Sequence, residues 1–182
     1  MAFAYSITNQ HHPHFLTFTV EQWIDVFTRQ HYVDIVLDSL RFCQQNKGLK
    51  IFSWCIMSNH IHLIVQSEPP FALSDTVRDF KKFTSRQLVR AIEQNNGESR
   101  QAWLLWLLHN QKDDKGKGIE FWQAGSHAEE IFSFEFYVQK MNYIHLNPVR
   151  AGYVLSPEEW QWSSAGNFYG RNGLLPLHYW NE

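Results

Sequence analysis

Two apolar runs separated by only two residues place the tightest constraint on how this chain can fold. LKIFSWCIM (Leu49 to Met57) and HIHLIVQS (His60 to Ser67) are rich in apolar, β-branched and aromatic residues, and only Ser58-Asn59 joins them. Runs of this length and composition favour strands, and so short a connection favours an antiparallel hairpin. Pro69-Pro70 ends the pair, because proline cannot donate to a strand ladder. The chain therefore has to pack around a central β-hairpin.

The remaining segments alternate between strand and helix patterns. Strands are expected at HFLTFTV (His14 to Val20) and IEFWQ (Ile119 to Gln123), and helices at YVDIVLDSLRFCQQN, LSDTVRDFKKFTSRQLVRAIEQNNG, RQAWLLWLLHN and SFEFYVQKMNYIHLN, the last ended by Pro148. QKDDKGKG (Gln111 to Gly118) is expected to be an exposed loop, and the tail from Ala151 to be irregular. This order predicts an α+β domain, with an antiparallel β-sheet of about four strands and helices packed on one face.

Length and composition fit a single soluble domain over residues 1–182. The chain is 44% hydrophobic and 16% aromatic, which is ample for a core. Its formal net charge of −2 means that any nucleic-acid binding must come from a local basic patch. Cys43 and Cys55 form no CxxC pair, the N-terminus does not resemble a signal peptide, and no apolar run is long enough to span a membrane. We expect a cytoplasmic protein with no membrane contact.

His60 and His62 stand at the start of the second apolar run. Side chains alternate along a strand, so Ile61, Leu63 and Val65 are expected on the core face and both histidines on the other face. Two imidazoles on a rigid strand can bind one metal ion. The chain has ten histidines, however, so a chance pair or ordinary surface polarity is the alternative.

Tyr143 and Asn147 are four residues apart in the last predicted helix, so they share one of its faces. The amide oxygen of Asn147 is a candidate third ligand for a metal held by the histidine pair. Two imidazole nitrogens and an amide oxygen suit Mn²⁺, and Mg²⁺ when phosphate oxygens complete the shell. The phenol of Tyr143 could then lie beside the ion. The alternative is an ordinary packing tyrosine.

Four blocks occur in a fixed order along the chain, namely MSNHIHLIV, FKKFTSRQL, FWQAGSH and YIHLNPVRAGYV…WSSA. Together they resemble the single-tyrosine HUH transposases of the IS200-like family, specifically the REP-associated tyrosine transposase branch, from about His14 to Tyr169. The resemblance implies a ferredoxin-like palm and a Mg²⁺- or Mn²⁺-dependent endonuclease and strand transferase. Its substrate would be single-stranded hairpin DNA resembling repetitive extragenic palindromes. The nucleophile falls on Tyr143 and the ligands on His60, His62 and Asn147, in a monomer or a homodimer.

Basic residues mark where DNA is expected to bind. Arg78, Lys82, Arg86 and Arg90 recur every fourth residue, with Lys81 beside them. Such a stripe suits phosphate contact, which positions DNA without reading its sequence. The alternative is a solvated helix face, balanced by nearby carboxylates.

Arg150, after the tyrosine helix, is a further candidate for phosphate contact. Lys140 lies one turn before Tyr143 and could favour its phenolate, although a solvated surface lysine is the simpler interpretation.

Two other functions remain open at this point. One is a hairpin-DNA-binding protein derived from a transposase that no longer cuts; the presence of both histidines, the tyrosine and the asparagine argues against it. The other is a metallohydrolase of small phosphoesters. Such enzymes usually show more ligands, as in an HxHxDH run, whereas Leu63-Ile64 follows His62 here.

Overall fold

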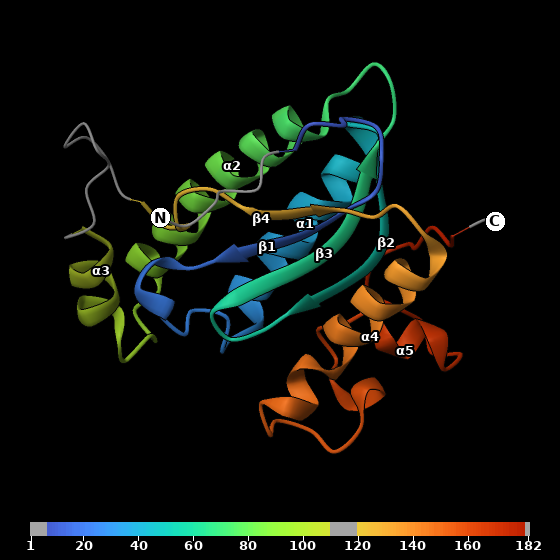
Figure 1. Ribbon diagram of the computed structural model, residues 1–182. Coiled ribbons are helices and arrows are strands. Elements are labelled where there is room, and N and C mark those ends of the chain that lie inside the picture. The colour runs from blue at the N-terminus through green and yellow to red at the C-terminus, as the bar shows by residue number, and fades with distance from the viewer. Residues whose placement is uncertain (1–6, 110–119, 181–182) are drawn as a thin grey trace.

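A computed structural model describes residues 7–109 and 120–180 of the chain (Figure 1). In chain order its elements are β1 (His14–Thr19), the 3₁₀ turn η1 (Glu21–Trp23), α1 (Gln30–Asn46), β2 (Leu49–Ile56), β3 (His60–Ser67), α2 (Leu73–Gln94), α3 (Gln101–His109), β4 (His127–Glu130), α4 (Phe134–Arg150), η2 (Pro157–Glu159) and α5 (Ala165–Phe168). The predicted hairpin is present as β2 and β3. The predicted loop Gln111 to Gly118 lies outside the described residues.

The four strands form one sheet in the order β2-β3-β1-β4, and all neighbouring strands are antiparallel. Each helical crossover, β1-α1-β2 and β3-α2-β4, therefore joins parallel strands that have another strand between them. Two such split β-α-β units make a ferredoxin-like palm. The predicted α+β class with a four-stranded antiparallel sheet is confirmed.

Helices cover both faces of the sheet, so the expectation of helices on one face is wrong. α1 and α2 lie side by side behind the sheet in Figure 1 and pack with Ile61, Leu63 and Val65. α4 packs on the other face, where Phe52 and Ile64 are buried. The reason is that β2 and β3 are apolar on both faces, and a strand of that kind needs cover on each side.

The predicted fourth strand, Ile119 to Gln123, is also wrong. Trp122 makes only an isolated bridge to Val20, which is too little for a strand. Its indole nitrogen donates to the Thr84 hydroxyl at 3.0 Å, so the side chain packs into the core. Ile119 lies outside the described residues. The real edge strand is β4, whose sequence HAEE pairs with β1 through its backbone. It carries no apolar alternation because it lies at the margin of the sheet.

α4 runs through Pro148 and ends at Arg150, three residues later than expected. A Schellman motif closes it: Gly152, at φ +76°, donates to the Val149 carbonyl at 3.0 Å, and Tyr153 donates to the Pro148 carbonyl at 2.9 Å. Asn147 therefore sits in a regular helical turn rather than in a frayed end.

The C-terminal tail packs along the outer edge of β2. The Ile56 amide donates to the Trp162 carbonyl at 2.8 Å, and the Ser164 amide donates to the Trp54 carbonyl at 2.9 Å. These bonds cover an edge that would otherwise expose unpaired backbone groups. The tail expected to be irregular thus contains η2 and α5 and completes the sheet. Within the described segments, no helix combines the length and the apolar character needed to cross a membrane.

Candidate functional site

β3 and α4 bring the four predicted site residues together. The ring centroids of His60 and His62 are 4.7 Å apart, and the Tyr143 ring is 5.3 Å from that of His62. The Asn147 side-chain nitrogen is 3.0 Å from Nε2 of His62. His62 and Asn147 are 85 positions apart in the sequence, so the fold itself makes this cluster.

Each histidine has a partner that fixes its ring. Nδ1 of His62 lies 2.9 Å from the Thr17 hydroxyl, and Nδ1 of His60 lies 2.7 Å from the side-chain oxygen of Asn59. An Nδ1–H that donates to these oxygens leaves the Nε2 lone pair of each ring for a further group. Metal-binding histidines are usually oriented in this way by an outer partner.

Burial keeps both imidazoles neutral. It lowers the pKa of His62 to about 3, with smaller contributions from His60, His127 and Lys140. Burial also lowers the pKa of His60, against a hydrogen bond to the Asn147 side chain that raises it. At physiological pH both rings therefore present lone pairs for which protons do not compete, as a metal ligand requires.

The donor set fits a divalent cation. Two imidazole nitrogens and one amide suit Mn²⁺, or Mg²⁺ with phosphate oxygens in the shell. Rotating the Asn147 amide by half a turn presents its oxygen in place of its nitrogen. Across residues 7–109 and 120–180, no group of three or more His, Cys, Asp or Glu side chains gathers in a metal-binding arrangement. Asn147, whose side chain lies 3.0 Å from Nε2 of His62, is the candidate third protein ligand.

Tyr143 is held at its ring and remains 41% exposed. Its ring packs edge-on against Phe15, at 5.9 Å between centroids, and against His62. The Arg150 guanidinium carbon lies 5.5 Å from the centroid of the Tyr143 ring. A tyrosine fixed in this way beside two neutral imidazoles, with a cation above it, is placed to meet a phosphate.

The first part of the chain, residues 8–107, matches the family model described as "Transposase IS200 like". That match spans more than half of the chain and includes the histidine pair. The chain belongs to the IS200-like transposase family. Tyr143 and Asn147 lie beyond the matched residues, so their place in the site rests on the structure.

Among the solved structures that resemble this transposase-family chain are two whose matches cover most of it. One is a REP-associated tyrosine transposase bound to a REP hairpin: it is 18% identical, the match covers 100% of this chain and 93% of that one, and the TM-score is 0.67. The other, assigned as a transposase, is from Deinococcus radiodurans R1: it is 18% identical over 79% of this chain and 92% of that one, at a TM-score of 0.45. The first likeness shows a shared fold. No curated protein matches.

Lys140 is engaged elsewhere in this transposase fold. Its ammonium is 2.6 Å from a Glu129 carboxylate oxygen and 4.6 Å from the centroid of the Phe15 ring. The His127 ring contacts the same carboxylate at 2.8 Å. Assistance of Tyr143 by Lys140 stays a prediction, and this ion pair competes with it.

The basic stripe lies on α2, across the sheet from the histidines. Arg78 pairs with Asp75 at 2.6 Å and with Asp79 at 3.2 Å. The Lys81 ammonium donates to the backbone carbonyls of Gln123 and Gly125 at 2.9 and 2.6 Å, and burial lowers the pKa of Lys81 to about 8. Arg78 and Lys81 are therefore both engaged in contacts within the protein.

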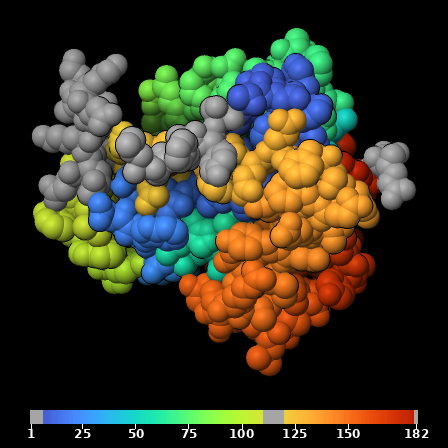
Figure 2. All heavy atoms as spheres, in the orientation of Figure 1, coloured from blue at the N-terminus to red at the C-terminus, as the bar shows by residue number. Residues whose placement is uncertain are grey.

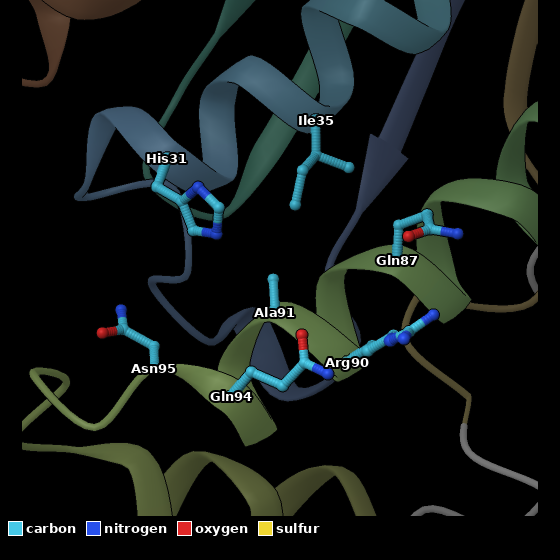
Figure 3. Close-up of a pocket in the computed structure, with 7 residues that line it drawn as sticks. All are labelled: His31, Ile35, Gln87, Arg90, Ala91, Gln94 and Asn95. Carbon is cyan, nitrogen blue, oxygen red and sulfur yellow. The ribbon is translucent and has the colours of Figure 1, made fainter.

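The other three cations of the stripe are exposed. Lys82, Arg86 and Arg90 line a groove together with Phe121 and Trp122. A second hollow, of about 560 Å³, lies between α1 and α2, with Arg90 on one wall and His31 on the other (Figure 3). Both hollows are on the α1–α2 side of the sheet. DNA contact by these residues, and by Arg150, stays a prediction.

Three residues near the histidines were not identified from the sequence. Thr17 faces His62 through the β1–β3 register, which sequence alone does not reveal. Asn59 adjoins His60, and its place in a two-residue turn was the available signal. Trp23 contacts His60 at 5.9 Å between ring centroids, and no pattern in the sequence points to it.

Proposed function

We propose that this chain cuts and rejoins single-stranded hairpin DNA through a covalent link to Tyr143. The observation that carries the proposal is the convergence of Tyr143 and Asn147, one turn apart on α4, on the His60–His62 pair of β3. Membership of the IS200-like transposase family supports DNA transposition as the context. The resemblance in fold to a REP-associated tyrosine transposase bound to a REP hairpin supports hairpin DNA as the substrate.

His60, His62 and Asn147 would hold Mg²⁺ or Mn²⁺. When bound there, the cation would supply Lewis-acid polarisation of the scissile phosphate. Thr17 and Asn59 orient the two rings through Nδ1, and burial keeps those rings unprotonated. The protein's own part is thus to keep the ligating nitrogens available.

Tyr143 supplies the nucleophile. Its phenol oxygen forms a bond to phosphorus as the bond from phosphorus to the 3′ oxygen breaks; the phenol proton is released and the 3′ oxygen becomes a hydroxyl. The product is a 5′-phosphotyrosine and a free 3′-OH. Because the phosphoester is kept, a second 3′-OH can reverse the step and join a new strand. The guanidinium of Arg150 lies over the Tyr143 ring, where it can meet a phosphate oxygen.

A covalent-adduct assay tests this proposal. The full chain is incubated with single-stranded hairpin DNA from the flanks of its own gene, with Mn²⁺ or Mg²⁺, and a denaturant-resistant protein–DNA band is sought. We expect the band from the wild type and none from Tyr143→Phe or His60→Ala. A band from Tyr143→Phe would move the nucleophile elsewhere. Tight hairpin binding without any band would favour a DNA-binding protein that does not cut.

A further inference from the structure

Trp23 lies beside the histidine pair with its indole largely in solvent. The centroids of the Trp23 and His60 rings are 5.9 Å apart, the ring planes meet at 70°, and the Trp23 side chain is 59% exposed. Tryptophan has the largest apolar surface of any side chain and gains much from burial. An indole left exposed next to a candidate cleavage site is therefore available to pack against a ligand.

The backbone that carries this indole is strained. Gln22 and Trp23 both have φ of +55°, in the left-handed region that side chains other than glycine rarely adopt. Strain of this kind persists only where surrounding contacts hold it, and it is common at binding sites. Here the Trp23 amide donates to the Val20 carbonyl at 3.0 Å, and the Asn59 side chain donates to the Trp23 carbonyl at 3.3 Å.

Asn59 connects the backbone of Trp23 to the His60 ring. Its side-chain nitrogen also donates to Asp25 at 3.0 Å, and its side-chain oxygen accepts from His60 at 2.7 Å. The backbone adds to this connection, because the Val20 amide donates to the Asn59 carbonyl at 2.9 Å. A single side chain thus links the backbone that carries the exposed indole to a candidate metal-binding imidazole.

The turn that contains Asn59 is also held from the α4 side. The Ser58 hydroxyl lies 3.1 Å from the phenol oxygen of Tyr153, in the loop after α4. In the space-filling view, the orange surface of α4 and this loop lies beside the blue-green surface of the β2–β3 turn (Figure 2). The turn therefore joins the strained segment around Trp23 to the loop that follows α4, the helix that carries Tyr143.

We propose that Trp23 is a stacking platform for an unpaired base next to the scissile phosphate, which would lie at the metal site of His60 and His62. This inference rests on the proposed function and names a residue that would position its substrate. A base is attached through one sugar to its own phosphate, so a strand whose phosphate lies at the histidines has a base within reach of the neighbouring indole. Stacking on an aromatic face tolerates any base, which suits positioning rather than sequence recognition.

α3 provides matched controls. Trp103 and Trp106 are 51% and 63% exposed, comparable to Trp23, and they belong to a different element. A general loss of exposed aromatic surface should have similar effects at all three positions. A stacking contact at the cleavage site should be specific to Trp23.

Equilibrium binding is measured in the Tyr143→Phe background, so that cleavage does not interfere. The probe is a DNA hairpin with single-stranded flanks, taken from beside the gene for this chain. We expect Trp23→Ala to weaken binding by about 5- to 150-fold, the range expected for one stacked base, while Trp23→Phe retains most of the affinity. Trp103→Ala should bind as its parent does. Circular dichroism of each variant checks that folding is intact.

An abasic scan of the flank locates the stacked base. Replacing one particular flank nucleotide with an abasic residue should weaken binding when Trp23 is present, and should cost nothing further in Trp23→Ala. Equal binding by Trp23→Ala and its parent, or an abasic penalty that does not depend on Trp23, would overturn the stacking role and leave the proposed function standing. If the parent bound no hairpin or single strand at all, both proposals would fail.

Discussion

Thr17 lies directly opposite His62 in the β1–β3 ladder, and its hydroxyl is 2.9 Å from Nδ1 of that ring. The contact joins neighbouring central strands and fixes which nitrogen of His62 faces Asn147. If His62 is a metal ligand, as proposed, this hydroxyl orients it from outside the metal's shell, so its loss should act on metal affinity before it acts on folding.

Replacing Thr17 with Val should therefore raise the Mn²⁺ concentration needed for adduct formation by about 10- to 100-fold, since outer partners of metal-binding histidines typically contribute that much. Thr17→Ser keeps the hydroxyl and is the control. The measurement is a Mn²⁺ titration of the adduct yield, with thermal unfolding run alongside. An unchanged Mn²⁺ dependence in Thr17→Val would remove the orienting role.

His145 predicts how stability should depend on pH. It is buried, its Nε2 contacts the hydroxyls of Ser164 and Ser53 at 2.8 and 3.1 Å, and burial lowers its pKa from 6.5 to about 4. The unfolded chain binds a proton at this position more readily than the folded chain does. Stability is thus fully present above about pH 6.5 and falls as the pH drops towards 4, by about 3 kcal/mol for this residue.

Urea unfolding between pH 4 and pH 7.5 measures this slope. His62 and His60 also have lowered pKa values and add to the slope in the same direction, so the informative quantity is the difference between wild type and His145→Gln. The variant should be less stable at pH 7.5 and should lose less on acidification. Parallel curves for the two proteins would contradict the prediction.

Glu98 is buried between two arginines. Its carboxylate accepts from Arg29 at 2.6 Å and from Arg100 at 3.1 Å, and these contacts lower its pKa to about 2. Glu98→Gln removes the charge and should cost about 2–3 kcal/mol, because hydrogen bonds to buried charges are stronger than neutral ones. The exposed pair Asp38–Arg41 is the comparison, and Asp38→Asn should cost under about 1 kcal/mol. Equal costs by urea unfolding would contradict the assignment.

The sequence predicted the central hairpin well, because alternation along β3 separates Ile61, Leu63 and Val65 from the histidines. The sequence did not reveal the edge strand β4, because that strand is held by backbone pairing with β1. β4 reads HAEE and shows no apolar alternation, since an edge strand can pair without burying its side chains. Apolar residues such as Phe52 and Cys55, on the face of β2 opposite the main core, were the available sign that a helix covers that face too.

The residues of the candidate site also fall into two groups, those that the sequence reveals and those that it does not. Residues separated by a fixed step along one element, such as His60 and His62, could be found from the sequence. Contacts between elements, such as Thr17 with His62, depend on strand register, and the position of Trp23 depends on a left-handed backbone. Neither feature leaves a periodic pattern in the sequence.

The basic stripe on α2 gives a prediction with its own control. Lys82 and Arg86 are exposed, whereas Arg78 is paired with Asp75 and Asp79. If the exposed cations contact phosphates, Lys82→Ala and Arg86→Ala should each lower the salt slope of hairpin binding by about one unit, through the loss of one released counterion. Arg78→Ala should leave the slope unchanged, because its charge is already compensated within the helix.

Fluorescence titrations over a range of salt concentrations measure the slopes. Unchanged slopes for Lys82→Ala and Arg86→Ala would identify the stripe as a solvated helix face, and would place the phosphate contacts on the α4 side of the sheet, where Arg150 lies.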